Sequence, residues 1–167
     1  MDLGIKKKWA LVTGGSHGVG LASAISLAQE GCNVICASRD ADKLAVVRKK
    51  ILSLESECMT FTFDALQVNS INTLFSDIEE TGVSPDILVN NVGGGGRWGS
   101  ENILANSSDV WDEVLQKNYQ CSRNLTLRAL PRMQERGWGR VICVTSIYGL
   151  MGEEDLGSIL RKPHKLC

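Results

Sequence analysis

Short apolar runs alternate with helix-period segments over most of this chain, and this rhythm limits the folds open to it. The run "WALV" at 9–12 is continuously apolar, as expected for a strand covered on both faces. Leu21, Ala24 and Ala28 follow at helical spacing, and Gly31 is placed to end that helix. Because alternating strands and helices build parallel sheets with crossover helices, the sequence predicts an α/β fold.

The same pattern recurs along the chain. Further strands are predicted at 33–38, 58–63, 86–90 and 139–146. Helical stripes are predicted at Leu44, Val47, Ile51 and at Val68, Ile71, Leu74, Phe75, Ile78. Asp40 is placed to cap the second helix, and the polar cluster 106–109 is placed to cap a long helix over 107–136. Beyond Ser146 the periodicity ends, so we expect a domain at 1–150 and an atypical tail at 151–167.

Composition restricts the classes of function. The 167 residues carry a formal net charge of -1, which argues against a nucleic-acid or membrane surface. No apolar run is long enough to span a bilayer, and the six cysteines form no CxxC pair. We therefore expect a cytoplasmic protein with buried free thiols and no metal site.

The stretch "VTGGSHGVG" at 12–20 forms a glycine-rich turn between the first strand and the first helix. Glycines allow the backbone to turn tightly and approach a pyrophosphate, whose charge then lies at the helix N-terminus. The alternative is a purely structural turn, and His17 is either an additional donor or an ordinary exposed histidine. The predicted cofactor contacts of this turn are Thr13, Gly14, Ser16, His17, Gly18, Val19 and Gly20.

Four motifs occur in a fixed order: "TGGSHGVG" at 13–20, "NNVG" at 90–93, "QKNY" at 116–119 and "VTSIYG" at 144–149. With these motifs the chain, from residue 5 to about 150, resembles the short-chain dehydrogenases/reductases, particularly those related to bacterial 3-oxoacyl-[acyl-carrier-protein] reductases. The resemblance implies a Rossmann-type doubly wound parallel sheet of strand order 3-2-1-4-5, without the family's C-terminal strands and helices. It also implies hydride transfer between NADPH and a small ketone or secondary alcohol.

Arg39 and Asp64 follow the second and third predicted strands. Arg39 stands where an acidic residue would hold the ribose of NAD, and its guanidinium suits the 2'-phosphate of NADP. The alternative is a solvated arginine at a strand end. By resemblance Asp64 binds the adenine amino group, although it could simply cap the next helix.

The remaining predicted site residues follow the fourth and fifth strands or lie on the long helix. Asn90, Asn91 and Gly93 are expected at the cofactor. Asn118 shares a helical stripe with apolar neighbours, which predicts an inward amide held by a polar network or a kink. By resemblance, Asn118 holds a water of the proton relay, and the hydroxyl of Ser146 bonds the substrate carbonyl. The alternatives are a satisfied polar group in the core for Asn118 and an ordinary loop serine for Ser146.

The pattern then departs from the family, which requires Tyr-x-x-x-Lys on a helix. Here Ser158 stands at the tyrosine position, and Lys162, four residues later, matches the catalytic lysine that in the family lowers the tyrosine pKa and holds the nicotinamide ribose. The alternative is that this lysine, in a basic tail, matches by chance. A serine hydroxyl is a weaker acid than a phenol, so the proton donor is missing. We expect either a truncated product or a non-catalytic NADP-binding module, with homo-oligomerisation through 107–136 as the expected protein contact.

Overall fold

The computed structural model describes residues 2–67, 69–94 and 106–146. Five parallel strands form one sheet of order β3-β2-β1-β4-β5. The strands are β1 Trp9–Thr13, β2 Asn33–Ser38, β3 Cys58–Thr62, β4 Ile87–Asn90 and β5 Arg140–Cys143. The predicted α/β class and strand order are confirmed.

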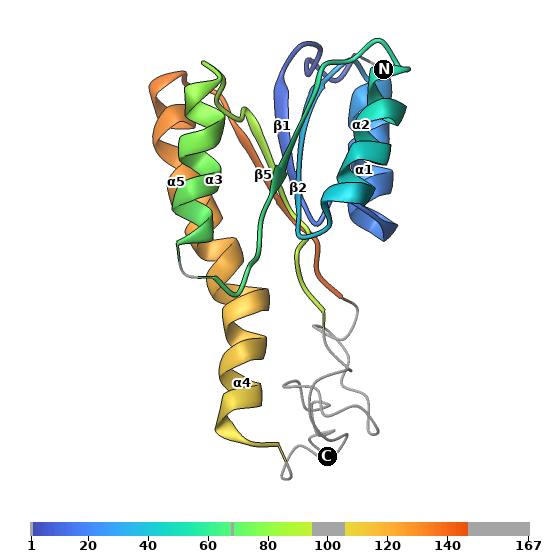
Figure 1. Ribbon diagram of the computed structural model, residues 1–167. Helices are drawn as coiled ribbons and strands as arrows, with labels where there is room; N and C mark the ends of the chain where they lie inside the picture. The colour runs from blue at the N-terminus through green and yellow to red at the C-terminus, as the bar shows by residue number, and fades with distance from the viewer. Residues whose placement is uncertain (1, 68, 95–105, 147–167) are drawn as a thin grey trace, which may run out of the picture.

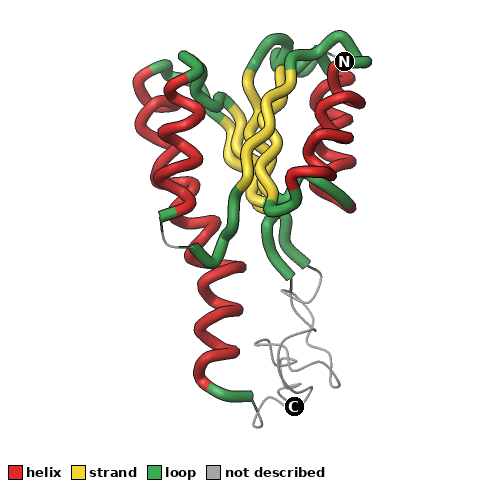
Figure 2. The backbone as a smooth tube through the Cα atoms, in the orientation of Figure 1, coloured by secondary structure: helices red, strands yellow, loops and turns green. Residues whose placement is uncertain are grey.

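Helices cover both faces of the sheet (Figure 1). Helices α1 Gly18–Gln29 and α2 Ala41–Leu52 lie on one face, and α3 Ser70–Glu80 and α5 Cys121–Glu135 on the other. Helix α4 Ser108–Leu115 leads into α5 through a π-helical turn, η2 Gln116–Gln120, and extends beyond the carboxyl ends of the strands (Figure 2). The predicted long helix is therefore one helical segment with a π turn near its middle.

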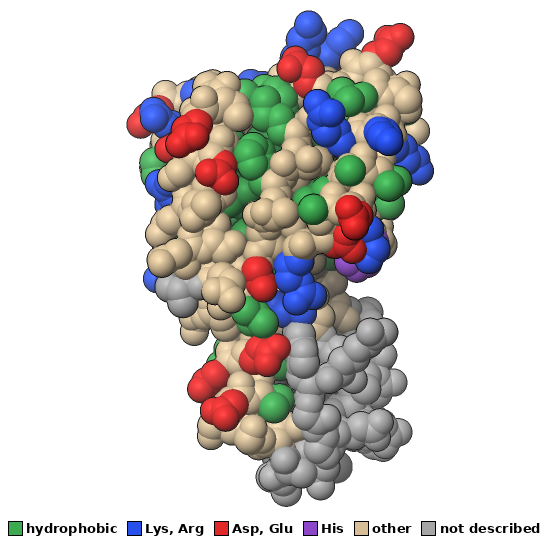
Figure 3. Space-filling view, in the orientation of Figure 1, with side chains coloured by type: hydrophobic (Ala, Val, Ile, Leu, Met, Phe, Trp, Pro, Cys, Tyr) green, Lys and Arg blue, Asp and Glu red, His purple; other side chains and the backbone are tan. Residues whose placement is uncertain are grey.

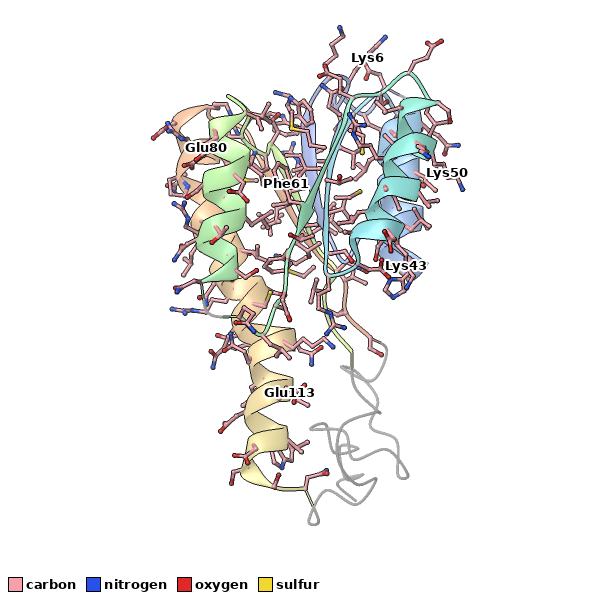
Figure 4. All side chains as sticks on the ribbon, viewed as in Figure 1. Lys6, Lys43, Lys50, Phe61, Glu80 and Glu113 are labelled. Atoms are coloured by element: carbon pink, nitrogen blue, oxygen red, sulfur yellow. The ribbon has the colours of Figure 1, made fainter. Side chains whose placement is uncertain are left out.

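Alternate residues of each strand face opposite helical layers, and this divides the core in two. Leu11 and Leu88 join the cluster of α3 and α5, whereas Val12 and Val89 join that of α1 and α2. In Figure 4 the side chain of Phe61 lies between the sheet and α3, and it packs against the first cluster. Burial on both faces explains why these strands read as continuous apolar runs.

The predicted helix caps have different outcomes. Asp40 accepts a hydrogen bond from the Lys43 backbone N–H at 3.0 Å, which confirms it as the cap of α2. This bond, with that from the Lys43 side chain, lowers the pKa of the Asp40 carboxyl. Ser107 occupies the N-cap position of α4, but its side chain makes no capping hydrogen bond.

Strand β5 is an edge of the described sheet, and all four of its residues are exposed.

The prediction of buried free thiols is confirmed for Cys32, Cys36, Cys58 and Cys121. It is wrong for Cys143, because β5 pairs with β4 alone among the described strands. Cys167 and the predicted tail lie outside the described residues. Within the described ranges no helix is long and apolar enough to cross a membrane.

Truncation of a central side chain tests this core. Leu88 is fully buried in β4, so Leu88→Ala should lower the free energy of unfolding by about 2–5 kcal/mol through lost burial and a residual cavity. Val46 is 67% exposed on α2, and Val46→Ala should change that free energy by less than about 0.5 kcal/mol. Urea unfolding followed by circular dichroism measures both, and equal losses would contradict the described packing.

Candidate functional site

A pocket of about 350 Å³ lies at the carboxyl ends of β1, β2 and β4. Its lining includes eight predicted cofactor residues: Gly14, His17, Gly18, Val19, Arg39, Asp64, Asn91 and Gly93. The other four, Thr13, Ser16, Gly20 and Asn90, are buried and do not line it. The structure thus separates residues that face the pocket from residues that hold its wall in place.

The glycine-rich turn presents backbone to this pocket. A side chain at Gly18 would meet no atom within 4 Å, so the backbone there has open space before it. A Cβ on Gly20 would lie 2.3 Å from the Gly14 carbonyl oxygen, so this glycine serves packing. His17 is the N-cap of α1 and makes no side-chain cap bond, which leaves the helix N-terminus suited to an anion.

Thr13 joins β1 to β4 at the wall of the pocket. Its hydroxyl donates to the Val89 carbonyl oxygen at 3.2 Å and accepts from the backbone N–H groups of Asn91 and Val92 at 3.1 and 3.3 Å. The Asn91 amide donates back to the Thr13 carbonyl oxygen at 3.1 Å. These bonds fix the ends of two neighbouring strands.

Asn90 supports the opposite side of β4. Its amide nitrogen donates to the Thr126 hydroxyl at 3.0 Å, which ties the strand to α5. Its side-chain oxygen is buried with no hydrogen-bond partner among the described residues. The positions of Asn90 and Thr13 therefore indicate structural support rather than direct contact with the pocket.

Arg39 and Asp64 line the same pocket from the ends of β2 and β3. Ser38, before Arg39, donates to the Ser16 hydroxyl at 2.7 Å, so β2 is tied to the glycine-rich turn. Asp64 accepts from the Leu66 backbone N–H at 3.0 Å in a local turn. The alternative that it caps the next helix is wrong, because α3 begins at Ser70 with Asn69 at its N-cap. This bond does not remove Asp64 from the pocket lining.

Asn118 lies in the π-helical turn, and its side chain is directed to the backbone that follows β4. Its oxygen accepts from the Gly94 N–H at 2.8 Å, and its nitrogen donates to the Gly94 and Val114 carbonyl oxygens at 3.0 and 2.9 Å. The predicted polar network and helix irregularity are both present. The predicted burial is wrong: Asn118 is exposed, because α4 and the π turn extend beyond the sheet.

The other two predicted catalytic residues, Ser146 and Lys162, are not part of the described pocket lining. Ser146 follows β5 on the carboxyl side of the sheet, is exposed, and is absent from the pocket lining. A hydrogen bond from the Val144 N–H to the Asn90 carbonyl oxygen at 2.9 Å keeps this segment beside β4. Lys162 and Ser158 lie outside the described residues.

Sequence reasoning missed Lys117, which also lines the pocket. Burial, and then the positive charge of Arg39, lower the pKa of its ammonium group, although Glu113 and Asp64 oppose this effect. The available signal was its place in "QKNY" beside Asn118. The sequence pattern assumes a regular α-helix. It therefore did not predict a π turn that brings Lys117 to the pocket and Asn118 to the backbone after β4.

Comparison of the chain with known protein families identifies the family to which it belongs. Residues 8–157 match the family described as short chain dehydrogenase. The chain belongs to this family. The pocket at the strand ends of this family member thus lies where open α/β sheets bind ligands.

Individual relatives support the same assignment. A "dehydrogenase/reductase SDR family protein 7-like" of Anopheles gambiae is 35% identical over 85% of this chain and 45% of the relative. The 3-oxoacyl-[acyl-carrier-protein] reductase FabG of Buchnera aphidicola is 31% identical over 89% of this chain and 58% of the relative. The chain therefore spans about half the length of these relatives.

A solved structure, the F189W actinorhodin polyketide ketoreductase with NADPH, superposes on the fold with a TM-score of 0.82. It is 30% identical, and the match covers 90% of this chain and 57% of that one. The fold of this chain is therefore that of an oxidoreductase family with NADP-bound members.

Removal of the Thr13 hydroxyl tests the wall of the pocket. Thr13→Val should lower the free energy of unfolding by about 1–3 kcal/mol, because it keeps the shape but leaves two backbone N–H groups without their acceptor. Thr13→Ser keeps the hydroxyl and is the control, with a smaller expected loss from its missing methyl group. Urea unfolding measures both variants, and equal stability of Thr13→Val and the unaltered chain would disprove the clamp.

Proposed function

We propose that this chain binds NADP(H) in the described pocket and takes part in hydride transfer between NADPH and a small ketone or secondary alcohol. The observation that carries the proposal is the set of family-motif residues around one pocket, with Arg39 at the end of β2. The solved ketoreductase with NADPH, at 30% identity, supports the choice of cofactor.

The pocket residues fit the dinucleotide in chemical type. The open backbone at Gly18 and the N-terminus of α1 would hold the pyrophosphate, since backbone N–H groups and the helix dipole favour an anion there. The guanidinium of Arg39 would bind the 2'-phosphate, and the carboxylate of Asp64 would accept from the adenine amino group. Asn118 would keep the backbone at Gly94 in place beside the cofactor.

The proposed chemistry needs a hydride, a polarised carbonyl and a proton. When bound, the nicotinamide supplies the hydride to the carbonyl carbon. The Ser146 hydroxyl would donate a hydrogen bond to the carbonyl oxygen, which becomes the alcohol oxygen on taking up a proton. Ser158 stands at the family's proton-donor position and is a poor acid, so turnover should be slow unless water delivers the proton.

The second candidate is a non-catalytic NADP-binding module, which the serine at position 158 favours. In either case we propose a cytoplasmic protein, because the five described cysteines are free thiols.

Contact between copies would use the helical segment α4–α5, where Leu115, Tyr119 and Leu127 are exposed. The state of association is measured by sedimentation at several protein concentrations.

Cofactor choice is tested at Arg39. Arg39→Met should weaken NADPH binding roughly 10- to 100-fold, because a charge-assisted pair with phosphate contributes about 1.5–3 kcal/mol, and should leave NADH binding nearly unchanged. Fluorescence titration of both cofactors measures the effect. Arg123→Met is the control, since Arg123 is exposed on α5 and lies outside the pocket lining. Equal losses for NADPH and NADH would disprove the phosphate role of Arg39.

Activity is tested in the same preparation with a panel of ketones that includes a 3-oxoacyl thioester. If turnover is measurable, Ser146→Ala should reduce kcat at least about 100-fold by removing the hydrogen bond to the carbonyl oxygen. Turnover that survives this substitution would overturn the assignment of Ser146. Cofactor binding without turnover would instead support the binding module.

A further inference from the structure

Two cationic side chains from distant parts of the sequence line the pocket. Arg39 comes from the end of β2, and Lys117 comes from the π-helical turn between α4 and α5. Among the described residues, Asp64 is the one carboxylate in that lining. In Figure 3 basic side chains gather with acidic ones near the carboxyl ends of the strands, above the grey segment. The pocket therefore combines two full positive charges with a single carboxylate.

Lys117 is held at this place by the residue that follows it. The amide of Asn118 bonds both the N–H and the carbonyl oxygen of Gly94, which fixes the π turn against the backbone after β4. The Lys117 ammonium nitrogen lies 4.0 Å from the position that a Cβ on Gly94 would occupy. The charge is thus brought from the helical segment to the β4 side of the pocket, where Gly93 also lies.

The surroundings of Lys117 disfavour the charged form of its ammonium group. Partial burial and the guanidinium of Arg39 lower the pKa of Lys117, and the carboxylates of Glu113 and Asp64 only partly offset them. Glu113 lies on α4, one turn before Lys117, and does not line the pocket (Figure 4). A dianionic group between the two cations would reverse this unfavourable balance, since opposite charges in a partly buried site attract strongly.

We propose that Lys117 is a second phosphate-binding residue, which acts with Arg39 on the 2'-phosphate of NADP and so helps to select NADP over NAD. The inference rests on the proposed function and extends it. Arg39 would supply a planar, two-point contact, and Lys117 a single compact charge from the π-helical turn. The pyrophosphate, by contrast, would be held by the glycine-rich turn and the helix N-terminus.

The test compares two nucleotides that differ only in the 2'-phosphate, adenosine 2',5'-bisphosphate and adenosine 5'-monophosphate, by isothermal titration calorimetry. Lys117→Met keeps the length of the side chain and removes its charge. It should weaken the bisphosphate about tenfold and leave the monophosphate within about twofold, because one charge-assisted contact is lost. Lys117→Arg keeps the charge and should stay within about threefold of the unaltered chain for both nucleotides.

Lys49→Met is the control, since Lys49 is an exposed lysine in the last turn of α2 and is outside the pocket lining. Lys117→Gln is the second neutral variant if Lys117→Met does not fold, as judged by circular dichroism. Equal weakening of both nucleotides, or no weakening of either, would overturn the inference while the proposed function stands. Failure of the unaltered chain to bind the bisphosphate or NADPH would overturn the proposed function itself.

Discussion

The hydroxyl of Thr13 is the interaction on which the rest of the site depends. It bonds three backbone groups of β4 and the segment after it, and so holds the carboxyl ends of two parallel strands together. The glycine-rich turn leaves from one of these strands, and the Gly93–Gly94 backbone leaves from the other. Because Thr13 is fully buried, water cannot replace these bonds without local opening of the sheet.

The π turn extends this arrangement to the helical layer. An extra residue in one helical turn often marks a functional site, because it redirects neighbouring side chains without ending the helix. Here it lets Asn118 bond the backbone after β4 and lets Lys117 line the pocket. The helical segment that packs on the sheet through α5 thus also supplies polar groups to the pocket.

The predicted cofactor residues lie together in the structure, whereas the predicted catalytic residues do not. Arg39, Asp64, Asn91 and the glycine-rich turn line one pocket, as binding of a dinucleotide requires. Ser146 follows β5, is exposed and is absent from that pocket lining, and Ser158 lies outside the described residues. The chain spans about half the length of these relatives.

The amino-acid sequence by itself determined the α/β class, the strand positions and the glycine-rich turn. Strands buried on both faces produce continuous apolar runs, and helices produce apolar residues at a spacing of three or four, so both can be recognised locally. It also placed Asp40 as a helix cap and Arg39 at a strand end. Only the tertiary structure decided that Thr13 and Asn90 support the wall, that Asn118 is exposed and that Lys117 reaches the pocket. Those outcomes depend on contacts between residues 24 to 79 positions apart and on one irregular helical turn, and neither leaves a periodic signal in the sequence.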